Sequence, residues 1–393
     1  MSDSLFLGFL LLLSGVTMAE QVTDIKVATF NVSMEASNYL PSGETGDNTV
    51  LASILANGNN PQVQNIAAII QRVRPDVLLL NEFDYIEDPK QGVAAFIKNY
   101  LNQSQHGSKP IDYPYFFYAT VNTGQPSPFD LDNDGQATGV GADAWGYGFY
   151  PGQYGMAILS KYPIDHANVR TFQHFKWRDM PDFMPTQKAD GSPWYSDDAW
   201  QQMPLSSKSH WDVPVIVGNT SVHFLASHPT PPVFDGPENR NGIRNHDEIR
   251  FWIDYLNPGN AGYIYDDNGN NGGLAENRRF VLLGDLNASA EAEGDAIHSA
   301  IRSLVNHRRI DNSFTPASLG GAEHTPERKF AQYHTASWRM RADYVLASDF
   351  GFNIKEGGVF WPAKNTPDYP LVGSRDASSD HRLVWVKLEL SAE

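Results

Sequence analysis

The chain has 393 residues, of which 41% are hydrophobic and 12% aromatic. A chain of this length can bury a sizeable core as one large domain or two smaller ones, and its composition excludes a disordered protein. Its formal charge of −17 argues against a protein that coats nucleic acid with a basic face. It contains no cysteine, which excludes disulfides and thiolate-bound zinc.

The N-terminus has the pattern of a cleaved signal peptide. Leu5 to Leu13 is an apolar run, and small residues at Thr17 and Ala19 suit cleavage after Ala19. The run is too short to span a bilayer, and no later segment is long and apolar enough to do so. The segment before the run has Asp3 and no Lys or Arg, so a buried N-terminal segment is the alternative. We therefore expect residues 1–19 to be removed and residues 20–393 to form one secreted or periplasmic domain.

Short strand patterns alternate with helical ones along the rest of the chain. Ile25 to Phe30 alternates apolar and polar residues, which predicts a half-buried strand. Asn60-Pro61 provides a cap and a first-turn proline for a helix that ends before Pro75. Val77 to Leu80 predicts a fully buried strand that leads directly into Asn81-Glu82.

The second part of the chain repeats this pattern. Further strands are predicted at Met156 to Leu159, Val213 to Val217, Val222 to Ala226, Phe280 to Leu283, Tyr344 to Leu346 and Leu383 to Leu390. One amphipathic helix presents Ile249, Trp252, Ile253 and Leu256, and another presents Ile297, Ile301 and Leu304. Interleaved helices and strands indicate a mixed α/β architecture. Long polar loops at roughly 121–153, 176–212, 257–277 and 311–337 are of the kind that carry function.

Polar residues with metal or acid–base chemistry lie where these strands begin or end. They are Asn31, Glu82, His228, Asp285, Asn287, Asp343, Asp380 and His381. Each alone is more often a turn residue or the first solvated residue after a strand. Together they form a set of hard oxygen ligands, amides and imidazoles that can converge along one edge of a sheet. This pattern is typical of a metal-assisted phosphoryl-transfer site.

The ordered motifs resemble a known family, the endonuclease/exonuclease/phosphatase superfamily, which has the fold of deoxyribonuclease I. The matching segments span most of the mature chain and are Thr29-Phe30-Asn31, Asn81-Glu82, Gln153 to Ser160, Ser227-His228, Gly284-Asp285-Leu286-Asn287, Arg341 to Val345 and Ser379-Asp380-His381. The resemblance implies a two-sheet α/β sandwich with helices on the outside. It also implies a hydrolase of phosphate esters.

The resemblance further implies a role for each motif residue. Glu82 would bind Mg²⁺ or Mn²⁺ with Asn31 and Asp380 close by, and Asp285 and Asn287 would hold the attacking water and the phosphate. His381 would be the general base or a phosphate contact, oriented by Asp343. His228 lies where the nuclease, sphingomyelinase and inositol-phosphatase branches carry histidine, whereas AP endonucleases typically carry asparagine there. The resemblance therefore favours those branches over AP-site repair. The sequence Ser227 to Pro232 matches none of them closely, which leaves the substrate open.

A second acidic motif lies in the first long loop. Asp130, Asp132 and Asp134 alternate before Gly135, as in the first half of a calcium loop. Gly141 stands where the closing glutamate would be, although Asp143 could close a longer loop. We expect a structural Ca²⁺ here, with a turn of solvated carboxylates as the alternative.

Six basic residues lie in or beside loops near the predicted site and are candidates for contact with a substrate phosphate: Lys208, Arg240, Arg244, Arg250, Arg339 and Arg341. Of these we single out Lys208 and Arg341. Pairing with local acids is an equally good explanation for each. The leading functional hypothesis is a phosphodiester hydrolase, with extracellular nucleic acid as the first substrate. A phosphatase or phospholipase acting on inositol phosphates or phospholipid headgroups is the alternative within enzymes. A calcium-stabilised, non-catalytic extracellular binding module is the alternative outside them.

Overall fold

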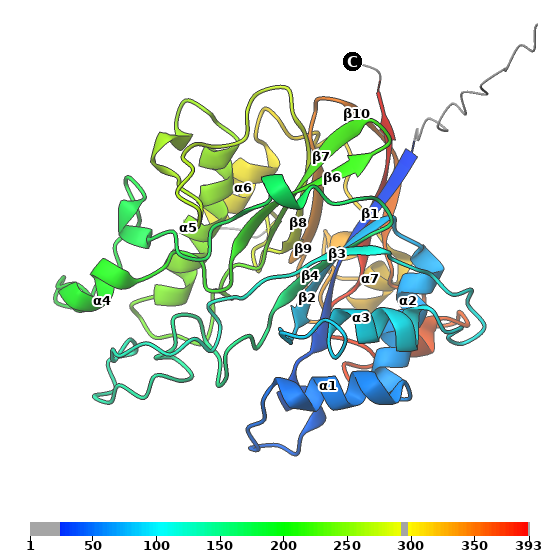
Figure 1. The fold of residues 1–393 in the computed structure, drawn as a ribbon, viewed down its shortest axis with the longest axis horizontal. Coiled ribbons are helices and arrows are strands. Elements are labelled where there is room, and N and C mark those ends of the chain that lie inside the picture. Colours follow the sequence, from blue (N-terminus) through cyan, green and yellow to red (C-terminus); the bar gives the residue numbers. More distant parts are fainter. Residues whose placement is uncertain (1–23, 292–297, 392–393) are drawn as a thin grey trace, which may run out of the picture.

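The structure, a computed structural model, describes residues 24–291 and 298–391 (Figure 1). Two mixed β-sheets pack face to face, and helices cover their outer faces. This is the predicted two-sheet α/β sandwich. The predicted signal peptide at 1–19 and the predicted helix residue Ile297 lie outside the described residues.

The first sheet has the strand order β10-β11-β1-β2-β4-β3. Its strands are β1 (Asp24–Met34), β2 (Val77–Phe83), β3 (Tyr115–Phe117), β4 (Met156–Ser160), β10 (Phe352–Val359) and β11 (Val384–Leu390). The second sheet has the order β5-β6-β7-β8-β9. Its strands are β5 (Arg170–Thr171), β6 (His210–Val217), β7 (Thr220–Ser227), β8 (Arg279–Asp285) and β9 (Asp343–Ala347). The last two strands of the chain therefore return to the sheet that the first strands began.

The helices fall into groups by the sheet that they contact. The helices α1 (Asn48–Asn57), α2 (Pro61–Val73) and α3 (Val93–Phe96) pack on the first sheet. The helices α5 (Arg240–Tyr255) and α6 (Ser299–Val305) pack on the second sheet. Two short helices, α4 (Asp197–Gln202) and α7 (Leu319–His324), form within the long loops. None of the helices in the described ranges is both long and apolar enough to cross a membrane.

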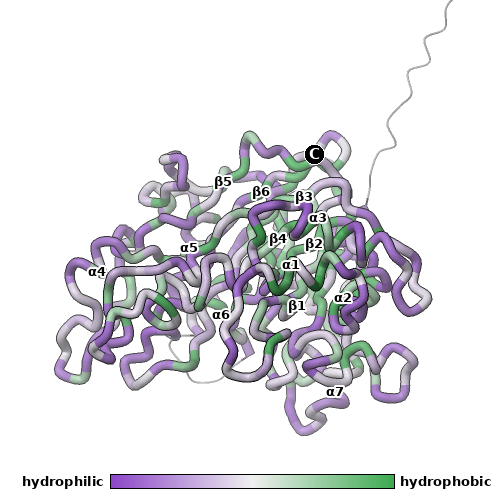
Figure 2. Tube along the Cα trace, turned by 60° about the horizontal axis from the view of Figure 1, so that its bottom comes forward, coloured by the Kyte–Doolittle hydropathy of each residue, from purple (hydrophilic) through white to green (hydrophobic). Residues whose placement is uncertain are grey.

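The buried strands of the second sheet contribute side chains to two hydrophobic cores, one on each face of the sheet. In β8, Val281 and Leu283 face the first sheet, whereas Phe280 and Leu282 face α5 and α6. This alternation follows from the two-residue period of a strand. Because both faces are covered, the strand is apolar throughout and reads as a continuous run in the sequence. The hydrophobic segments accordingly gather inside the molecule, under hydrophilic loops (Figure 2).

The first predicted strand differs from its prediction in length and in burial. It was expected to be half-buried and to end before Asn31, but β1 continues to Met34 and is buried on both faces from Val27 onward. The second sheet covers one face of β1 and helices cover the other, so water reaches neither face. Asn31 is therefore a buried residue inside a strand, and its side chain is held in a fixed direction.

Candidate functional site

The predicted polar residues meet at one end of the seam between the two sheets. The parallel strands β1 and β2 bring Asn31 and Glu82 to this end, and the parallel strands β7 and β8 bring His228 and Asp285. The antiparallel neighbours β9 and β11 begin at the same end, where they place Asp343, Asp380 and His381, and Asn287 follows the end of β8 there. Each sheet contributes half of the set, so the site exists only where the sheets pack together.

Asp285 is the centre of this arrangement and is 1% exposed. Its Oδ2 accepts a hydrogen bond from Asn31 Nδ2 at 3.1 Å, and Nε2 of both His228 and His381 lies 3.4 Å from the same oxygen. Its Oδ1 accepts from the backbone N–H of Asn287 at 3.0 Å. One carboxylate therefore contacts four of the other residues that the sequence singled out.

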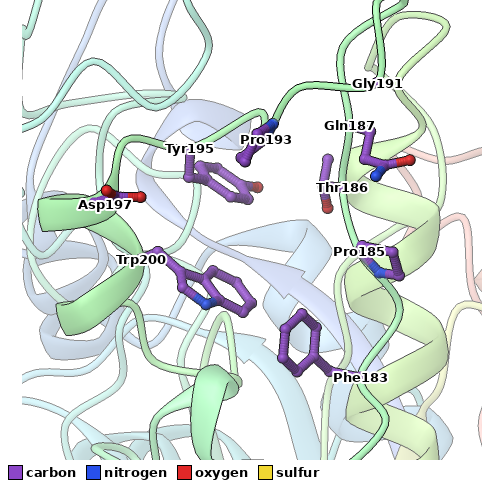
Figure 3. Close-up of a pocket in the computed structure, with 9 residues that line it drawn as sticks. All are labelled: Phe183, Pro185, Thr186, Gln187, Gly191, Pro193, Tyr195, Asp197 and Trp200. Carbon is purple, nitrogen blue, oxygen red and sulfur yellow. The ribbon is translucent and has the colours of Figure 1, made fainter.

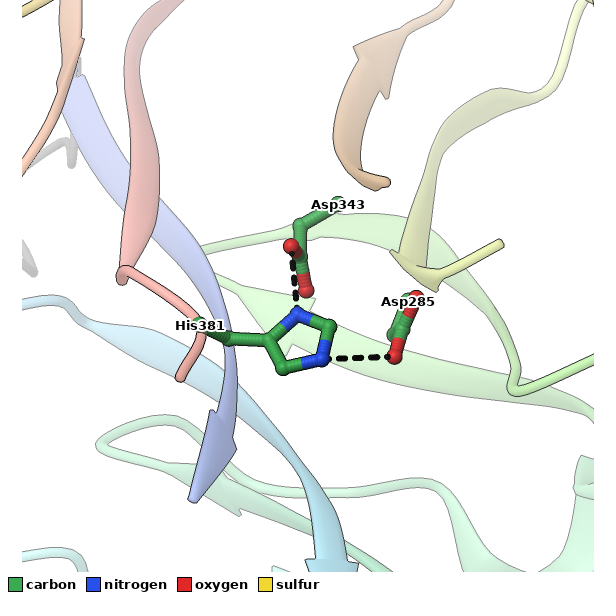
Figure 4. A group of neighbouring side chains, drawn as sticks. All are labelled: Asp285, Asp343 and His381. Atoms are coloured by element: carbon green, nitrogen blue, oxygen red, sulfur yellow. Dashed lines mark hydrogen bonds and ion pairs between the residues drawn. The ribbon is translucent and has the colours of Figure 1, made fainter. Parts of the chain in front are cut away.

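Asp343 holds the His381 ring from the other side (Figure 4). Asp343 Oδ2 lies 2.9 Å from His381 Nδ1 and also accepts the Thr335 hydroxyl at 2.7 Å. Because Nδ1 is used in this way, His381 Nε2 points at Asp285. The geometry matches the predicted orientation of His381 by Asp343. Thr335 in turn accepts the backbone N–H groups of Ala342 and Asp343, at 2.9 and 3.0 Å.

The backbone at the site takes conformations that side-chain-bearing residues usually avoid. Glu82 and Asn287 have φ angles of 54° and 51°, in the left-handed region. Such residues persist where the surroundings hold them, and they are common at functional sites. Gly284, with φ of 150°, permits the close approach of β7 to β8, because a Cβ there would lie 2.0 Å from the Ser227 carbonyl oxygen.

The buried charges shift one another's pKa values. Burial, with help from Asp343 and Glu82, raises the pKa of Asp285 to about 7. Burial lowers the pKa of His381, but the carboxylates of Asp343 and Asp285 outweigh it and raise that pKa overall. Burial, together with the positive charges of Lys208 and His381, lowers the pKa of His228 well below its usual value. At neutral pH, His381 is therefore a cation and His228 is neutral.

Glu82, Asp380 and Asn31 form a donor set that fits a hard divalent cation. Burial raises the pKa of Glu82, and repulsion from Asp380 adds to this shift, so a cation between the two carboxylates would relieve it. Carboxylate and amide oxygens are the ligands that Mg²⁺ and Mn²⁺ prefer. Asp285, Asp343 and His381 also place one ligand atom each within 4.8 Å of the others. His381 already joins the two carboxylates, through a hydrogen bond to Asp343 and an ion pair with Asp285, so we describe the three as a group that holds a proton.

The structure separates the two candidate phosphate contacts. Lys208 is 5% exposed, and its ammonium has no hydrogen bond or ion pair among the described residues. Burial lowers its pKa, and the carboxylates of Glu248, Glu82 and Asp285 only partly oppose this effect. Arg341 instead contacts Glu291 at 3.0 Å and lies over the Tyr344 ring. The alternative explanation, a local acidic partner, therefore holds for Arg341. Lys208 remains the candidate for a phosphate.

Sequence reasoning missed Glu248, a fully buried carboxylate that supports the site. Its two oxygens accept the backbone N–H groups of Ser207 and Thr230, both at 2.6 Å. These residues adjoin Lys208 and His228, so one side chain ties both loops to α5. Glu248 lies four residues before Trp252, on the apolar face of the predicted helix. An acid on that face is the signal that could have identified it.

The predicted calcium loop has the expected cluster but not the expected closing residue. Asp130, Asp132 and Asp134 place a carboxylate oxygen each within 4.8 Å of one another. Asp143 does not close the loop, because its oxygens accept the backbone N–H groups of Leu131 and Thr138. A structural Ca²⁺ on the three aspartates remains a prediction.

The loop at 176–212 builds a separate pocket of about 230 Å³ (Figure 3). Its walls include the rings of Phe183, Tyr195 and Trp200. None of the predicted site residues lines it.

The chain is similar to several known proteins. The model of the endonuclease/exonuclease/phosphatase family matches residues 28–381. Comparison with curated proteins finds no match. Similar solved structures include an endonuclease/exonuclease/phosphatase from Beutenbergia cavernae, with 16% identity, a TM-score of 0.49, and coverage of 94% of this chain and 72% of that one. Sphingomyelinase C from Streptomyces griseocarneus has 15% identity and a TM-score of 0.44, over 93% of this chain and 99% of that one. The human Nocturnin catalytic domain has 12% identity and a TM-score of 0.46, over 94% of each chain. The family match covers most of the chain, and the protein belongs to the endonuclease/exonuclease/phosphatase family.

Proposed function

We propose that the protein is a divalent-metal-dependent hydrolase of phosphodiesters, with extracellular nucleic acid as its first candidate substrate. Family membership supports hydrolysis of phosphate esters. The observation that carries the proposal is the convergence on Asp285 of Asn31, His228 and His381, drawn from both sheets. A non-catalytic binding module has no need for a buried carboxylate surrounded in this way.

The chain's own residues divide the work by charge. His381 is cationic, and the Lys208 ammonium has no hydrogen bond or ion pair among the described residues, so both can bind phosphate oxygens. Asp285, whose pKa is raised to about 7, can accept the proton of a water molecule as that water attacks phosphorus. The resemblance implied that His381 is either the general base or a phosphate contact, and its raised pKa favours the phosphate contact.

Asn31, Glu82 and Asp380 would hold Mg²⁺ or Mn²⁺. The bound ion would neutralise charge on the phosphate oxygens as the ester bond breaks. Asn287 would help to position the water or phosphate, since its Nδ2 donates to the Pro229 carbonyl at 3.1 Å and its side chain is thereby fixed.

The test is a hydrolysis panel of DNA, RNA, a chromogenic phosphodiester, phytate and sphingomyelin, each with Mg²⁺, Mn²⁺ or Ca²⁺. Asp285→Ala and His381→Ala should each lower kcat at least 100-fold. Asp349→Ala and His166→Ala are matched controls, because both residues are exposed and lie outside the site. Activity that survived both site substitutions would contradict the mechanism. Cleavage of phytate or sphingomyelin alone would establish the phosphatase or phospholipase alternative.

We also propose that the chain is secreted or periplasmic after cleavage behind Ala19. The first strand, β1, begins at Asp24, a few residues beyond that position. N-terminal sequencing of the protein recovered outside the cytoplasm should begin at Glu20. An intact Met1 on the recovered protein would contradict cleavage.

A further inference from the structure

Trp338 is an exposed ring that lies against the buried His381. Its side chain is 45% exposed, whereas that of His381 is 3% exposed. The two ring centroids are 4.6 Å apart with an interplanar angle of 85°, an edge-to-face contact. Any group attached to a phosphate that His381 holds therefore lies within reach of the Trp338 ring.

The turn that carries Trp338 is fixed to the strand end that carries His381. Ala336 N donates to Met340 O at 3.1 Å, which closes the turn, and Arg339 takes the left-handed φ of 74°. Ser337 N donates to the Asp380 carbonyl at 2.8 Å, and Ala336 forms a β-bridge with His381. Because of these bonds, the Trp338 ring is held in place beside the imidazole before a substrate arrives.

The same turn also presents a cation. Arg339 follows Trp338, is exposed, and its guanidinium has no hydrogen bond or ion pair among the described residues. Arg341, two residues later, is instead paired with Glu291. The chain has a formal charge of −17, so this unpaired arginine gives the turn a local positive charge on an otherwise acidic protein.

We propose that Trp338 stacks on a nucleobase joined to the scissile phosphate, and that Arg339 contacts a neighbouring phosphate of the same strand. This inference rests on the proposed phosphodiesterase function and names its substrate class as single-stranded nucleic acid. Aromatic rings and cations side by side are the usual means of holding a single strand, whose bases expose their faces. In a duplex those faces are covered by neighbouring bases.

A lipid surface suits this turn less well. Insertion into a membrane needs several apolar side chains together, and Trp338 is flanked by Ser337 and Arg339. Ala336 is fully buried and cannot add to such a surface.

The experiment compares two substrates of equal charge, a five-residue thymidine oligonucleotide and the same backbone with abasic sugars. In the wild type, kcat/KM should be higher for the thymidine substrate. Trp338→Ala should reduce this preference about 5- to 150-fold, the range measured for stacking of one base, mainly through KM. Trp338→Phe should retain most of it. Arg339→Gln should raise KM for both substrates and weaken its dependence on salt.

Phe350→Ala is the matched control, because this ring is 39% exposed and follows the opposite end of β9. It should leave the preference unchanged. If the wild type cleaves neither substrate nor any other phosphodiester, the proposed function fails and the inference fails with it. If the wild type cleaves both and Trp338→Ala leaves their ratio unaltered, only the base subsite is refuted. An equal fall in kcat on both substrates would mean that Trp338 acts through His381. If Trp338→Ala instead loses binding to phosphatidylcholine vesicles while its oligonucleotide kinetics are unchanged, Trp338 contacts a lipid surface. Either of these two outcomes would overturn the proposed base subsite.

Discussion

Glu248→Gln tests whether one buried carboxylate holds the two loops of the site. Both Glu248 oxygens accept a backbone N–H at 2.6 Å, one from Ser207 and one from Thr230. A glutamine offers one oxygen and one NH₂ group, so one of these N–H groups would face a donor. Orphaning a buried N–H costs about 1–3 kcal/mol, and replacing a charged acceptor by a neutral one adds about 1 kcal/mol. We expect the free energy of unfolding to fall by roughly 2–4 kcal/mol.

The activity of the same variant should fall as well. Ser207 precedes Lys208, and Thr230 lies two residues after His228, so loss of either bond loosens a loop that faces the phosphate site. Small misplacements of catalytic groups cost up to about 100-fold in rate. We expect kcat to fall at least 10-fold under conditions where the variant is fully folded.

Urea unfolding followed by tryptophan fluorescence measures the first effect, and hydrolysis of a chromogenic phosphodiester measures the second. Asp254→Asn is the matched control, because Asp254 lies on the same helix and accepts the Tyr263 hydroxyl at 2.7 Å, away from both loops. It should lose stability without losing kcat. A Glu248→Gln variant within about 0.5 kcal/mol of the wild type, or one with unchanged kcat, would refute the reasoning.

Three further expectations follow from other buried or clustered groups. Ca²⁺ bound at Asp130, Asp132 and Asp134 should stabilise the protein by roughly 1.4–2.7 kcal/mol when its concentration is about ten to one hundred times its Kd. If Ca²⁺ still raises the Tm of Asp132→Asn by the same amount, the ion binds elsewhere. Burial lowers the pKa of His210 to about 4, so the unfolded chain binds more protons between that pH and about 6.5. Stability should thus fall by up to about 3 kcal/mol as pH drops through this window, and His210→Gln should remove that part of the dependence in urea titrations. Thr335→Val removes the hydroxyl that donates to Asp343 and should lower kcat about 10-fold. Thr335→Ser retains the hydroxyl and should keep the wild-type kcat. Equal kcat in the two variants would contradict a role of Thr335 in orienting His381.

Sequence patterns predicted the buried strands well because those strands are covered on both faces. β8 and β9 are buried throughout, and such runs are recognisable without knowledge of their neighbours. The helix α1 was missed because it buries only Leu51 and Leu55, which is too few for a clear period. The edge strand β10 was missed because in FNIKEGGV the alternation of apolar and polar residues is interrupted by two glycines.

The candidate site divides along similar lines. Residues at strand ends could be predicted, because the strand pattern itself marks their positions. The roles of the supporting residues could not be predicted, since these roles depend on contacts made only in the folded chain. Glu248 bonds a residue 41 positions away, and Arg341 bonds Glu291 from 50 positions away. Trp338 meets His381 only because a turn is bonded to the last strand.

The return of β11 to the first sheet determines when the site can form during synthesis. Asp380 and His381 lie immediately before this strand, which pairs with β1 from the other end of the described chain. A ribosome-bound chain that has emerged only as far as β9 already carries Asn31, Glu82, His228 and Asp285, yet it lacks Asp380 and His381. Chains cut short before residue 380 should therefore be inactive even where both sheets have begun to fold. Catalytic ability is among the last properties that the growing polypeptide acquires.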